Sequence, residues 1–264
     1  MKERPSFPAR LDFWTGRPQA KHSEPVCGRN PLQTLTSLQS TIIPHGLGMD
    51  SSAVRMNMVR KLAAQGVEDS LVLSAMGTIE RHRFVDSALV NQAYEDTSLP
   101  IGLGQTISKP GVVARMVELL LHGMEGKMGR VLEIGTGCGY QAAVLSLLAK
   151  EVYSIERLRG LHEKARDNLR HLRLANVHLL FGDGMVGFAK GAPYAGIIAA
   201  AGGEAVPQAW IDQLAIGGRL VAPVVAGVAS SAKQALLVID KTPNGLRKTV
   251  LEAVHFVPLK SGVA

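Results

Sequence analysis

The residues best suited to chemistry lie at positions 131–139, VLEIGTGCG, where an apolar run is followed by three glycines at alternate positions. An amphipathic stretch continues from Tyr140. This order predicts a buried strand, a tight turn and a helix. Glycine has no β-carbon, so such a turn lets a ligand reach the main chain. A cofactor site is one interpretation, and an ordinary strand-to-helix turn is the other.

Two details of this motif argue against a dinucleotide cofactor. The pattern is G-x-G-x-G, whereas dinucleotide sites carry G-x-G-x-x-G with a later third glycine. Glu133, two residues before the first glycine, would repel a pyrophosphate. A carboxylate at this place instead suits a cation, such as the ammonium group of a methionine-type cofactor. We therefore expect a nucleoside cofactor without phosphate, with S-adenosylmethionine as the obvious candidate.

A second acid supports the cofactor interpretation. Glu156 closes the next apolar segment, residues 152–155. In nucleotide-binding βαβ units, an acid about twenty residues after the glycine turn accepts hydrogen bonds from ribose hydroxyls. Together, Glu133 and Glu156 favour a cofactor site over a plain turn.

The bulk properties exclude several classes of protein. The 264 residues are enough for one large α/β domain with an appendage, and the net charge of +7 comes from scattered basic residues without a long run, which argues against nucleic-acid binding. No apolar run reaches the roughly eighteen residues needed to cross a bilayer, and the first residues have no apolar core, so we expect no secretory signal in them. Cys27 and Cys138 fit no metal or redox spacing and look like free thiols of a reducing compartment. We expect a cytoplasmic monomer that binds neither membrane nor metal.

The chain divides into two parts. Residues 1–49 hold six prolines among Arg, Ser, Thr and Gln, a spacing that leaves no helical or alternating pattern. We interpret them as a flexible extension without an assigned role. Residues 50–264 are predicted to form the folded domain.

The folded part is predicted to begin with helices. Asp50 or Ser51 can cap a helix that runs through Gln65, and Asp69 or Ser70 opens a second one. Residues 94–108 show no regular period and are predicted to be a long loop, which is often functional. Pro110 starts a further helix, so that Ser108 is expected near its N-terminus, a place suited to holding an anion.

Strands then alternate with helices, which predicts an open, doubly wound and mostly parallel sheet. The predicted strands cover residues 131–134, 152–155, 177–181, 195–201 and 219–224, and a closing antiparallel hairpin covers 234–240 and 246–256. Ligands of such sheets bind outside the carboxyl ends of the strands. Glu133, Glu156 and Asp183 lie at or near such ends and are expected to converge on one crevice.

Several blocks together resemble the protein-L-isoaspartate O-methyltransferase family. The main ones are residues 94–108 with their PIGLGQTIS ending, VLEIGTGCGYQ at 131–141, and Gly182-Asp183-Gly184. Supporting pieces lie at 81–85, 206–214 and 256–259. The likeness covers about residues 52–260, and the GLGQTIS block is its most diagnostic part because other methyltransferases differ there.

The resemblance implies a Rossmann-like methyltransferase fold and a defined reaction. A methyl group would pass from S-adenosylmethionine to the free α-carboxylate of an L-isoaspartyl residue in an aged protein. The ester can collapse to a succinimide and reopen as aspartate, so the role would be protein repair. A carboxylate with a pKa near 4 is already ionised at neutral pH and needs alignment, not a general base.

The resemblance also implies roles for single residues. Ser108 would be the catalytic hydroxyl beside the acceptor carboxylate, with Thr106 and Ile107 shaping the substrate pocket; a plain helix N-cap is the other interpretation of Ser108. Glu156 would bind the ribose, and Asp183 with Gly184 would meet the adenine, unless Asp183 is a simple turn residue. The methionine end of the cofactor would be lined by Glu133, Ile134, Gly135, Thr136, Gly137 and Gly139.

Four positions depart from the family pattern. Ala195 replaces an acid, Gly203 belongs to an unusually plain run, Leu103 stands where an aromatic residue or histidine is frequent, and Glu80 replaces a common proline. Ala195 and Gly203 are expected to loosen the wall of the crevice.

Three other functions compete with this prediction. The first is a methyltransferase of the same fold that acts on another carboxylate or on a small molecule. The second is a non-catalytic module that binds S-adenosylmethionine or damaged protein. The third, a dinucleotide oxidoreductase, is disfavoured by Glu133.

Overall fold

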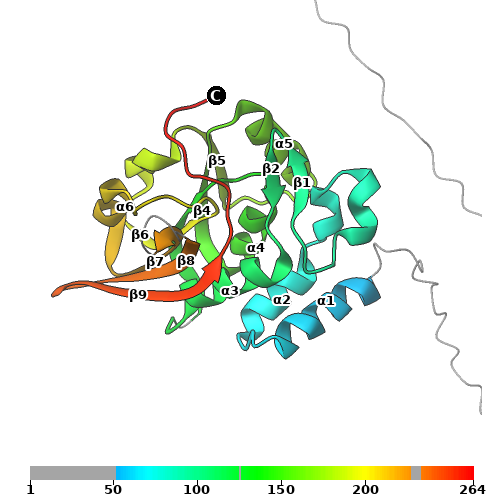
Figure 1. Ribbon diagram of the computed structural model, residues 1–264, viewed down its shortest axis with the longest axis horizontal. Coiled ribbons are helices and arrows are strands. Elements are labelled where there is room, and N and C mark those ends of the chain that lie inside the picture. Colours follow the sequence, from blue (N-terminus) through cyan, green and yellow to red (C-terminus); the bar gives the residue numbers. More distant parts are fainter. Residues whose placement is uncertain (1–51, 125, 227–232) are drawn as a thin grey trace, which may run out of the picture. The chain divides into compact units, whose positions relative to one another are not determined.

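The computed structural model describes residues 52–124, 126–226 and 233–264. The predicted extension at 1–49 and the two predicted cap residues, Asp50 and Ser51, lie outside this part of the chain. The described residues form a central sheet with helices on both faces (Figure 1). No helix among them is long and apolar enough to cross a membrane.

The seven-stranded sheet has the strand order β5-β4-β3-β6-β7-β8-β9. Neighbouring strands are parallel from β5 to β7, and β8 is antiparallel to both β7 and β9. This confirms the predicted mostly parallel sheet with a closing hairpin. The strands are β3 (Met128–Ile134), β4 (Ala149–Glu156), β5 (Val177–Phe181), β6 (Tyr194–Ala199), β7 (Leu214–Ala226), β8 (Lys233–Thr242) and β9 (Gly245–Val254).

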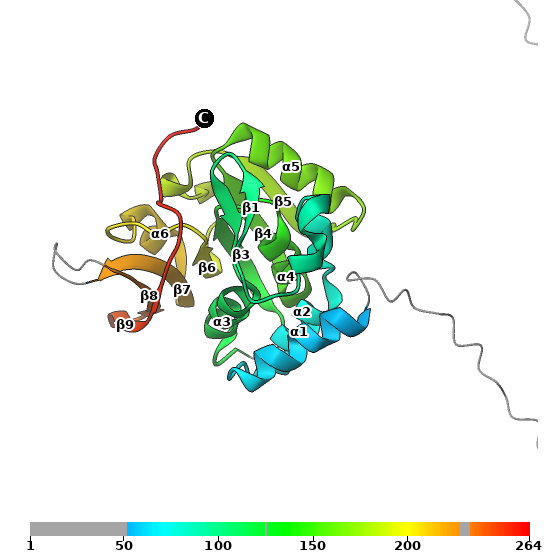
Figure 2. The ribbon, with the colours of Figure 1, turned by 45° about the vertical axis from the view of Figure 1, so that its right-hand side comes forward.

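Both faces of the central strands are buried, as expected for a parallel sheet between two layers. Val131 and Leu132 point to opposite faces, and both are fully buried. Val131 belongs to the cluster that holds the helices α3 (Pro110–Leu121), α4 (Tyr140–Leu148) and α5 (Arg159–Arg170), whereas Leu132 packs with α6 (Gln208–Gln213). Figure 2 shows α6 on the side of the sheet opposite to these three helices. Short 3-10 turns, η3 (Gly184–Val186) and η4 (Ala189–Gly191), follow β5.

The predicted N-terminal helices are present. Helix α1 (Ser52–Ala64) and helix α2 (Ser70–Thr78) pack outside α3 and α4 (Figure 2). Asp69 caps α2, since its Oδ1 accepts hydrogen bonds from the N–H groups of Leu71 (2.8 Å) and Val72 (3.1 Å). Two 3-10 turns, η1 (Arg81–Phe84) and η2 (Ser87–Gln92), connect α2 to the next segment.

The prediction of an irregular loop at 94–108 was wrong in part. This stretch contains two short antiparallel strands, β1 (Leu99–Gly102) and β2 (Gln105–Ile107). Gly102, Leu103 and Gly104 all have positive φ, at 98°, 52° and 69°. The apolar residues of such short strands show no period, so the pairing depends on this turn and on packing against the domain.

Candidate active site

The glycine turn lies at the carboxyl end of β3, at the centre of the sheet. Gly135, Gly137 and Gly139 have φ values of 90°, 56° and 91°, which residues with a β-carbon rarely adopt. A β-carbon on Gly139 would also come within 3.0 Å of Leu169 in α5. The turn is therefore built for glycine, and its residues Ile134 to Cys138 line a cavity of about 500 Å³.

The carboxylate of Glu156 is fixed at the end of β4, next to this turn. One oxygen accepts a hydrogen bond from Gly137 N (2.9 Å) and the other from Leu158 N (2.9 Å). The residue is only 5% exposed, yet it lines the cavity. Each carboxylate oxygen can accept a further hydrogen bond, so the group can still bind a ligand hydroxyl.

Glu133 lies behind the cavity wall and not in it. Its carboxyl is fully buried and accepts a hydrogen bond from Ser154, whose hydroxyl pairs with that of Thr136 at 2.6 Å. Burial raises the pKa of Glu133 to about 8; the side chains of Ser154 and Gln141 oppose this rise by hydrogen bonding, and the nearby Glu156 adds to it. The carboxyl is therefore largely protonated at neutral pH, unless a cation approaches it.

Two polar atoms near the turn have no hydrogen bond of normal geometry within the described residues, although the Gln141 side chain lies close enough to the Glu133 carboxyl to lower its pKa. They are Oε1 of Glu133 and Nε2 of Gln141, both buried. Buried polar groups in native proteins are almost always fully paired, so an acceptor and a donor without a well-formed hydrogen bond suit the ammonium and carboxylate groups of a methionine-type cofactor. The residues present thus fit S-adenosylmethionine.

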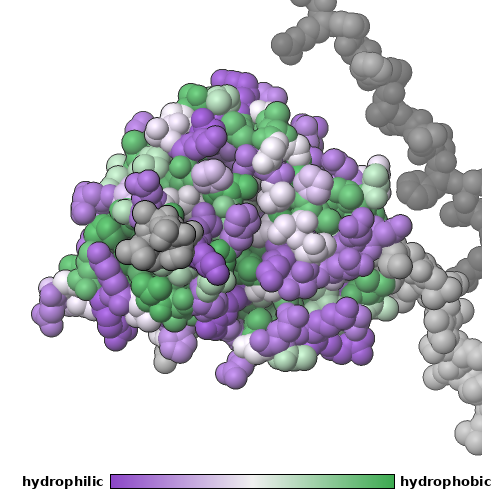
Figure 3. All heavy atoms as spheres, viewed as in Figure 1, coloured by the Kyte–Doolittle hydropathy of each residue, from purple (hydrophilic) through white to green (hydrophobic). Residues whose placement is uncertain are grey.

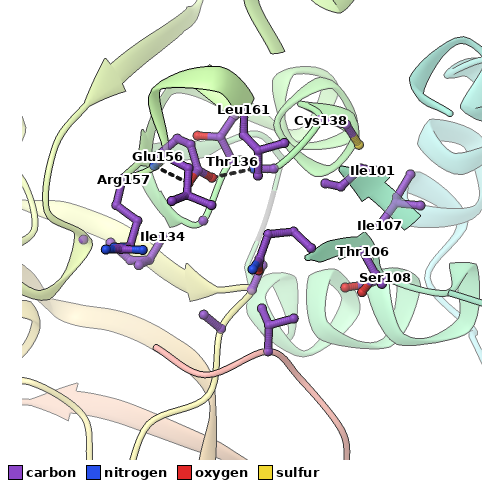
Figure 4. A pocket seen from close by; sticks show the side chains of 18 of the residues that line it. Ile101, Thr106, Ile107, Ser108, Ile134, Thr136, Cys138, Glu156, Arg157 and Leu161 are labelled. Carbon is purple, nitrogen blue, oxygen red and sulfur yellow. Dashed lines mark hydrogen bonds between the residues drawn. The ribbon is translucent and has the colours of Figure 1, made fainter. Parts of the chain in front are cut away.

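The opposite wall of the cavity comes from the β1–β2 hairpin and its continuation. Figure 4 shows Ile101, Thr106 and Ser108 across the cavity from Glu156 and Thr136. Lys109, and not Ser108, stands at the N-cap position of α3. The N-cap interpretation of Ser108 is therefore wrong, and its half-buried hydroxyl has no hydrogen-bond partner among the residues described.

A second, larger cavity of about 1340 Å³ meets the first one at Ser108. Both cavities are lined by Thr106, Ser108, Ala200 and Val257. The second one continues between the start of α3 and the strands β8 and β9, with Arg115 and Glu252 in its wall. A small molecule in the first cavity and a chain segment in the second could therefore touch at Ser108.

The outer wall of the first cavity is formed by a segment from the end of the chain, residues 257–260. Asp183 holds this segment in part, since its Oδ2 accepts a hydrogen bond from Gly262 N at 2.7 Å. Its Oδ1 accepts from Met185 N at 2.8 Å. Gly184 lines the cavity, and a β-carbon there would lie 2.6 Å from Cγ2 of Ile134.

Most of the predicted site residues lie together around the first cavity. Its lining includes Thr106, Ile107, Ser108, Ile134, Gly135, Thr136, Gly137, Glu156 and Gly184. Three others lie outside the lining: Glu133 and Gly139 support the turn from behind, and Asp183 engages the chain segment around Gly262. Of Glu133, Glu156 and Asp183, which were predicted to converge on one crevice, Glu156 lines the cavity. Glu133 and Asp183 are not in its lining.

The sequence analysis missed several lining residues and misjudged two departures. Gln141 and residues 257–259 line the cavity, although their sequence context predicts no role in a site. Of the departures, Leu103 lines the cavity, whereas Ala195 and Gly203 line neither cavity. Ala195 lies near the amino end of β6, away from the carboxyl ends of the strands, so a loosened crevice wall at this residue is not supported.

Comparison with known proteins identifies this arrangement. The family model described as protein-L-isoaspartate(D-aspartate) O-methyltransferase matches residues 53–264. A protein-L-isoaspartate O-methyltransferase of Methylibium petroleiphilum is 56% identical over 98% of this chain and 96% of its own length. One of Leptothrix cholodnii is 57% identical over 83% of this chain and 77% of its own.

Solved structures agree with the fold. A protein-L-isoaspartate O-methyltransferase structure superimposes with a TM-score of 0.71 at 30% identity, over 79% of this chain and 67% of the other. A Plasmodium falciparum protein in complex with S-adenosyl-L-homocysteine shares the fold with a TM-score of 0.68 at 23% identity, over 78% and 98% of the two chains. With the family model matching most of its length, the chain belongs to the protein-L-isoaspartate(D-aspartate) O-methyltransferase family.

Proposed function

We propose that this enzyme holds the methyl donor at the glycine turn and the acceptor carboxylate at Ser108. The reaction is the transfer of a methyl group from S-adenosylmethionine to the free carboxylate of an L-isoaspartyl residue in a damaged protein, which initiates repair. The observation that carries the assignment of roles is the junction of the two cavities, where Thr106 and Ser108 face both.

The first cavity is proposed to bind S-adenosylmethionine, which when bound supplies a methyl group on a positively charged sulfur. Glu156 would accept hydrogen bonds from ribose hydroxyls, because its oxygens are held in place by Gly137 and Leu158. Gln141 lines the cavity and would pair with the carboxylate of the methionine end, while Glu133, buried behind the wall, would favour its ammonium group through its charge. Gly184 leaves room beside Ile134, whereas Asp183 is proposed to act on the wall of the site and not on the adenine directly.

Ser108 is proposed to orient the acceptor by donating a hydrogen bond from its free hydroxyl. The acceptor carboxylate is ionised at neutral pH, so no proton has to be removed before it attacks. The transferred methyl forms a new bond to a carboxylate oxygen as its bond to sulfur breaks, and the carboxylate charge is lost with the sulfonium charge. Orientation of the two partners can lower such a barrier by several kcal/mol, up to roughly 10.

The second cavity is proposed to hold the polypeptide on either side of the isoaspartyl residue. Its volume of about 1340 Å³ and its lining by α3, β8 and β9 suit an extended chain segment better than a small metabolite. This observation favours a protein substrate over a small-molecule acceptor in an enzyme of the same fold.

The assay for this function is labelled-methyl transfer to an isoaspartyl peptide, with the aspartyl peptide of the same sequence as control. We expect methylation of the first and background counts on the second. Equal labelling of both peptides, or cofactor binding without transfer, would refute the proposal. Ser108→Ala should lower kcat/KM by about ten- to hundredfold, the worth of a hydrogen bond to a charged group, with the cofactor Kd unchanged.

We further propose that the enzyme works as a cytoplasmic monomer on proteins and peptides, without nucleic acid. The buried free thiol of Cys138 and the scattered basic residues support this. Light scattering behind a sizing column tests the first point, where a mass near 28.1 kDa is expected and twice this mass would contradict it.

A further inference from the structure

Helix α3 begins two residues after Ser108, at Pro110, and its positive end is already occupied by a side chain of the protein. Gly111 N donates a hydrogen bond to Oδ1 of Asp96 at 2.7 Å. The N–H groups of Val112 and Val113 are engaged by the carbonyl of Lys109, at 3.1 and 3.2 Å, and Pro110 has no N–H. The first turn of α3 therefore offers no free donor to an outside anion, contrary to the anion site expected there.

The carboxylate of Asp96 lies close to Lys109 and Gly111, the two residues that flank Pro110. Lys109 Nζ lies 3.7 Å from Oδ2. On the other side, a β-carbon on Gly111 would come within 2.9 Å of Oδ1. Asp96 thus contacts the residues on both sides of Pro110, within three positions of Ser108, and it lines the second cavity together with Ser108.

The segment that carries Asp96 is itself anchored from the protein interior. The fully buried guanidinium of Arg81 donates a hydrogen bond from Nε to the carbonyl of Ala93 at 2.7 Å. The same guanidinium lies over the ring of Tyr140, 5.0 Å from its centroid. Tyr140 is the first residue of α4 and directly follows the glycine turn. The Arg81 guanidinium therefore contacts both the segment that carries Asp96 and the helix that follows the glycine turn.

We propose that Asp96 is a positioning residue for methyl transfer. Its hydrogen bond to Gly111 fixes the start of α3 and thereby the direction of the Ser108 hydroxyl at the junction of the two cavities. By filling the positive end of α3, its carboxylate also directs the acceptor carboxylate to Ser108. The inference rests on the proposed role of Ser108 as the group that orients the acceptor.

Three variants test the contact, and one provides a matched control. Asp96→Ala removes the hydrogen bond, whereas Asp96→Asn keeps an oxygen that can accept it. Gly111→Ala displaces the Asp96 carboxylate from the other partner, while alanine favours the helix. Asp69→Ala removes a carboxylate cap of the same kind from α2, and Asp69 lines neither cavity.

Steady-state kinetics with an isoaspartyl peptide gives the readout, together with the cofactor Kd from calorimetry. We expect Asp96→Ala and Gly111→Ala to lower kcat/KM by about tenfold or more, mainly in kcat, because a small displacement of an orienting group is costly. Asp96→Asn should keep kcat/KM within about threefold of the wild type, because its side-chain oxygen can still accept the hydrogen bond from Gly111 N. Asp69→Ala should keep it within about twofold, because this cap of α2 lies outside both cavities. The cofactor Kd should be unchanged in all four.

Three results would overturn the inference. They are wild-type kinetics in both Asp96→Ala and Gly111→Ala, an equal loss in Asp69→Ala, or a parallel loss of cofactor affinity. If Asp96→Ala does not fold, Gly111→Ala alone tests the inference. This variant is expected to fold, since its added β-carbon meets the end of the Asp96 side chain, which can move aside. Ser108→Ala in the same assay separates the two proposals: if it keeps full activity, the role of Ser108 fails, whereas a loss there with normal Asp96 variants refutes only the role of Asp96.

Discussion

Glu133 shows how burial changes the meaning of a residue that the sequence singles out. A carboxylate before the glycine turn indicates a binding group for a cation, which presumes that it carries a charge. In the folded chain its pKa is raised to about 8, mainly by burial, so the negative charge is largely absent at pH 7 until a cation is bound. Sequence spacing shows where the acid lies along the chain, but its protonation depends on how deeply the fold buries it.

The affinity for the cofactor is therefore predicted to rise with pH. A ligand ammonium near the wall stabilises the ionised form of Glu133, so binding at pH 6 costs the removal of a proton that is progressively lost as the pH rises through about 8. The Kd of S-adenosylhomocysteine should be about tenfold or more tighter at pH 8 than at pH 6. Calorimetry across this range in buffers of different ionisation enthalpy should also detect proton release below pH 8.

Glu133→Gln is the control for this pH dependence. This variant should bind more weakly at pH 8 and with little change between pH 6 and pH 8. A wild-type Kd that does not change with pH, or an equal pH dependence in Glu133→Gln, would contradict the role of this carboxyl.

Gly184 is predicted to be required by packing, beyond its place in the Gly182-Asp183-Gly184 turn. A β-carbon on Gly184 would lie 2.6 Å from Ile134, whereas one on Gly182 would lie 3.8 Å from Ile155, an ordinary contact. Gly184→Ala should lower the free energy of unfolding by about 1–3 kcal/mol, as overpacking does, and Gly182→Ala by much less. Chemical denaturation of the two variants measures this difference, and equal stability of both would contradict it.

At the scale of elements, helices and strands with a regular pattern of apolar residues were predictable from the sequence. Short strands whose pairing depends on contacts with the rest of the domain were not. The strand at Val177–Phe181 and the helix that starts at Pro110 were found at the predicted residues, because their apolar patterns and flanking breakers are local. The β1–β2 hairpin was missed, since strands of four and three residues carry no period of their own. Its tip residue, Leu103, has a positive φ that propensity does not predict.

The segment after β9 illustrates a second limit of the sequence. Nothing in the order of residues 257–264 indicates that they run beside the ends of β4, β5 and β6. There, Leu259 N donates to the carbonyl of Gly202 (2.7 Å), and Ala264 N donates to that of Arg157 (2.8 Å). These are long-range main-chain contacts, which leave no pattern in the side chains. The segment nevertheless forms one wall of the cofactor cavity.

Loosening this segment is predicted to weaken cofactor binding. Asp183→Ala removes the acceptor of Gly262 N, and removal of residues 261–264 removes the donor. Asp183→Ala should raise the Kd of S-adenosylhomocysteine by about tenfold. The truncation should raise it at least as much, because it also removes the hydrogen bonds of Ala264 with Arg157 and Arg159. The double change should be no worse than the truncation alone, since the Asp183 contact is already lost in it. Fully additive effects would place Asp183 in direct contact with the cofactor instead.

At the scale of the molecule, we predict that the folded domain, which is expected to begin near residue 50, is active without residues 1–49. The site residues all lie between Thr106 and Gly184, and the cavity walls continue to Lys260. A chain of residues 50–264 should therefore keep the wild-type cofactor Kd and a kcat/KM within about twofold of the full chain. Circular dichroism and the peptide assay check this, and loss of folding or activity would show that residues 1–49 belong to the working domain.

On the face shown in Figure 3, hydrophilic and hydrophobic residues are interspersed. The net charge of +7 is spread along the sequence, so binding of the peptide should depend on contacts in the second cavity more than on long-range electrostatic attraction.

A crystal structure of the enzyme with S-adenosylhomocysteine and an isoaspartyl peptide tests the central claim most directly. The account predicts the ribose at Glu156, the sulfur facing the junction of the two cavities, and the acceptor carboxylate within hydrogen-bond distance of the Ser108 hydroxyl. A cofactor bound elsewhere, or a sulfur and carboxylate separated by the wall at Thr106 and Ala200, would contradict it.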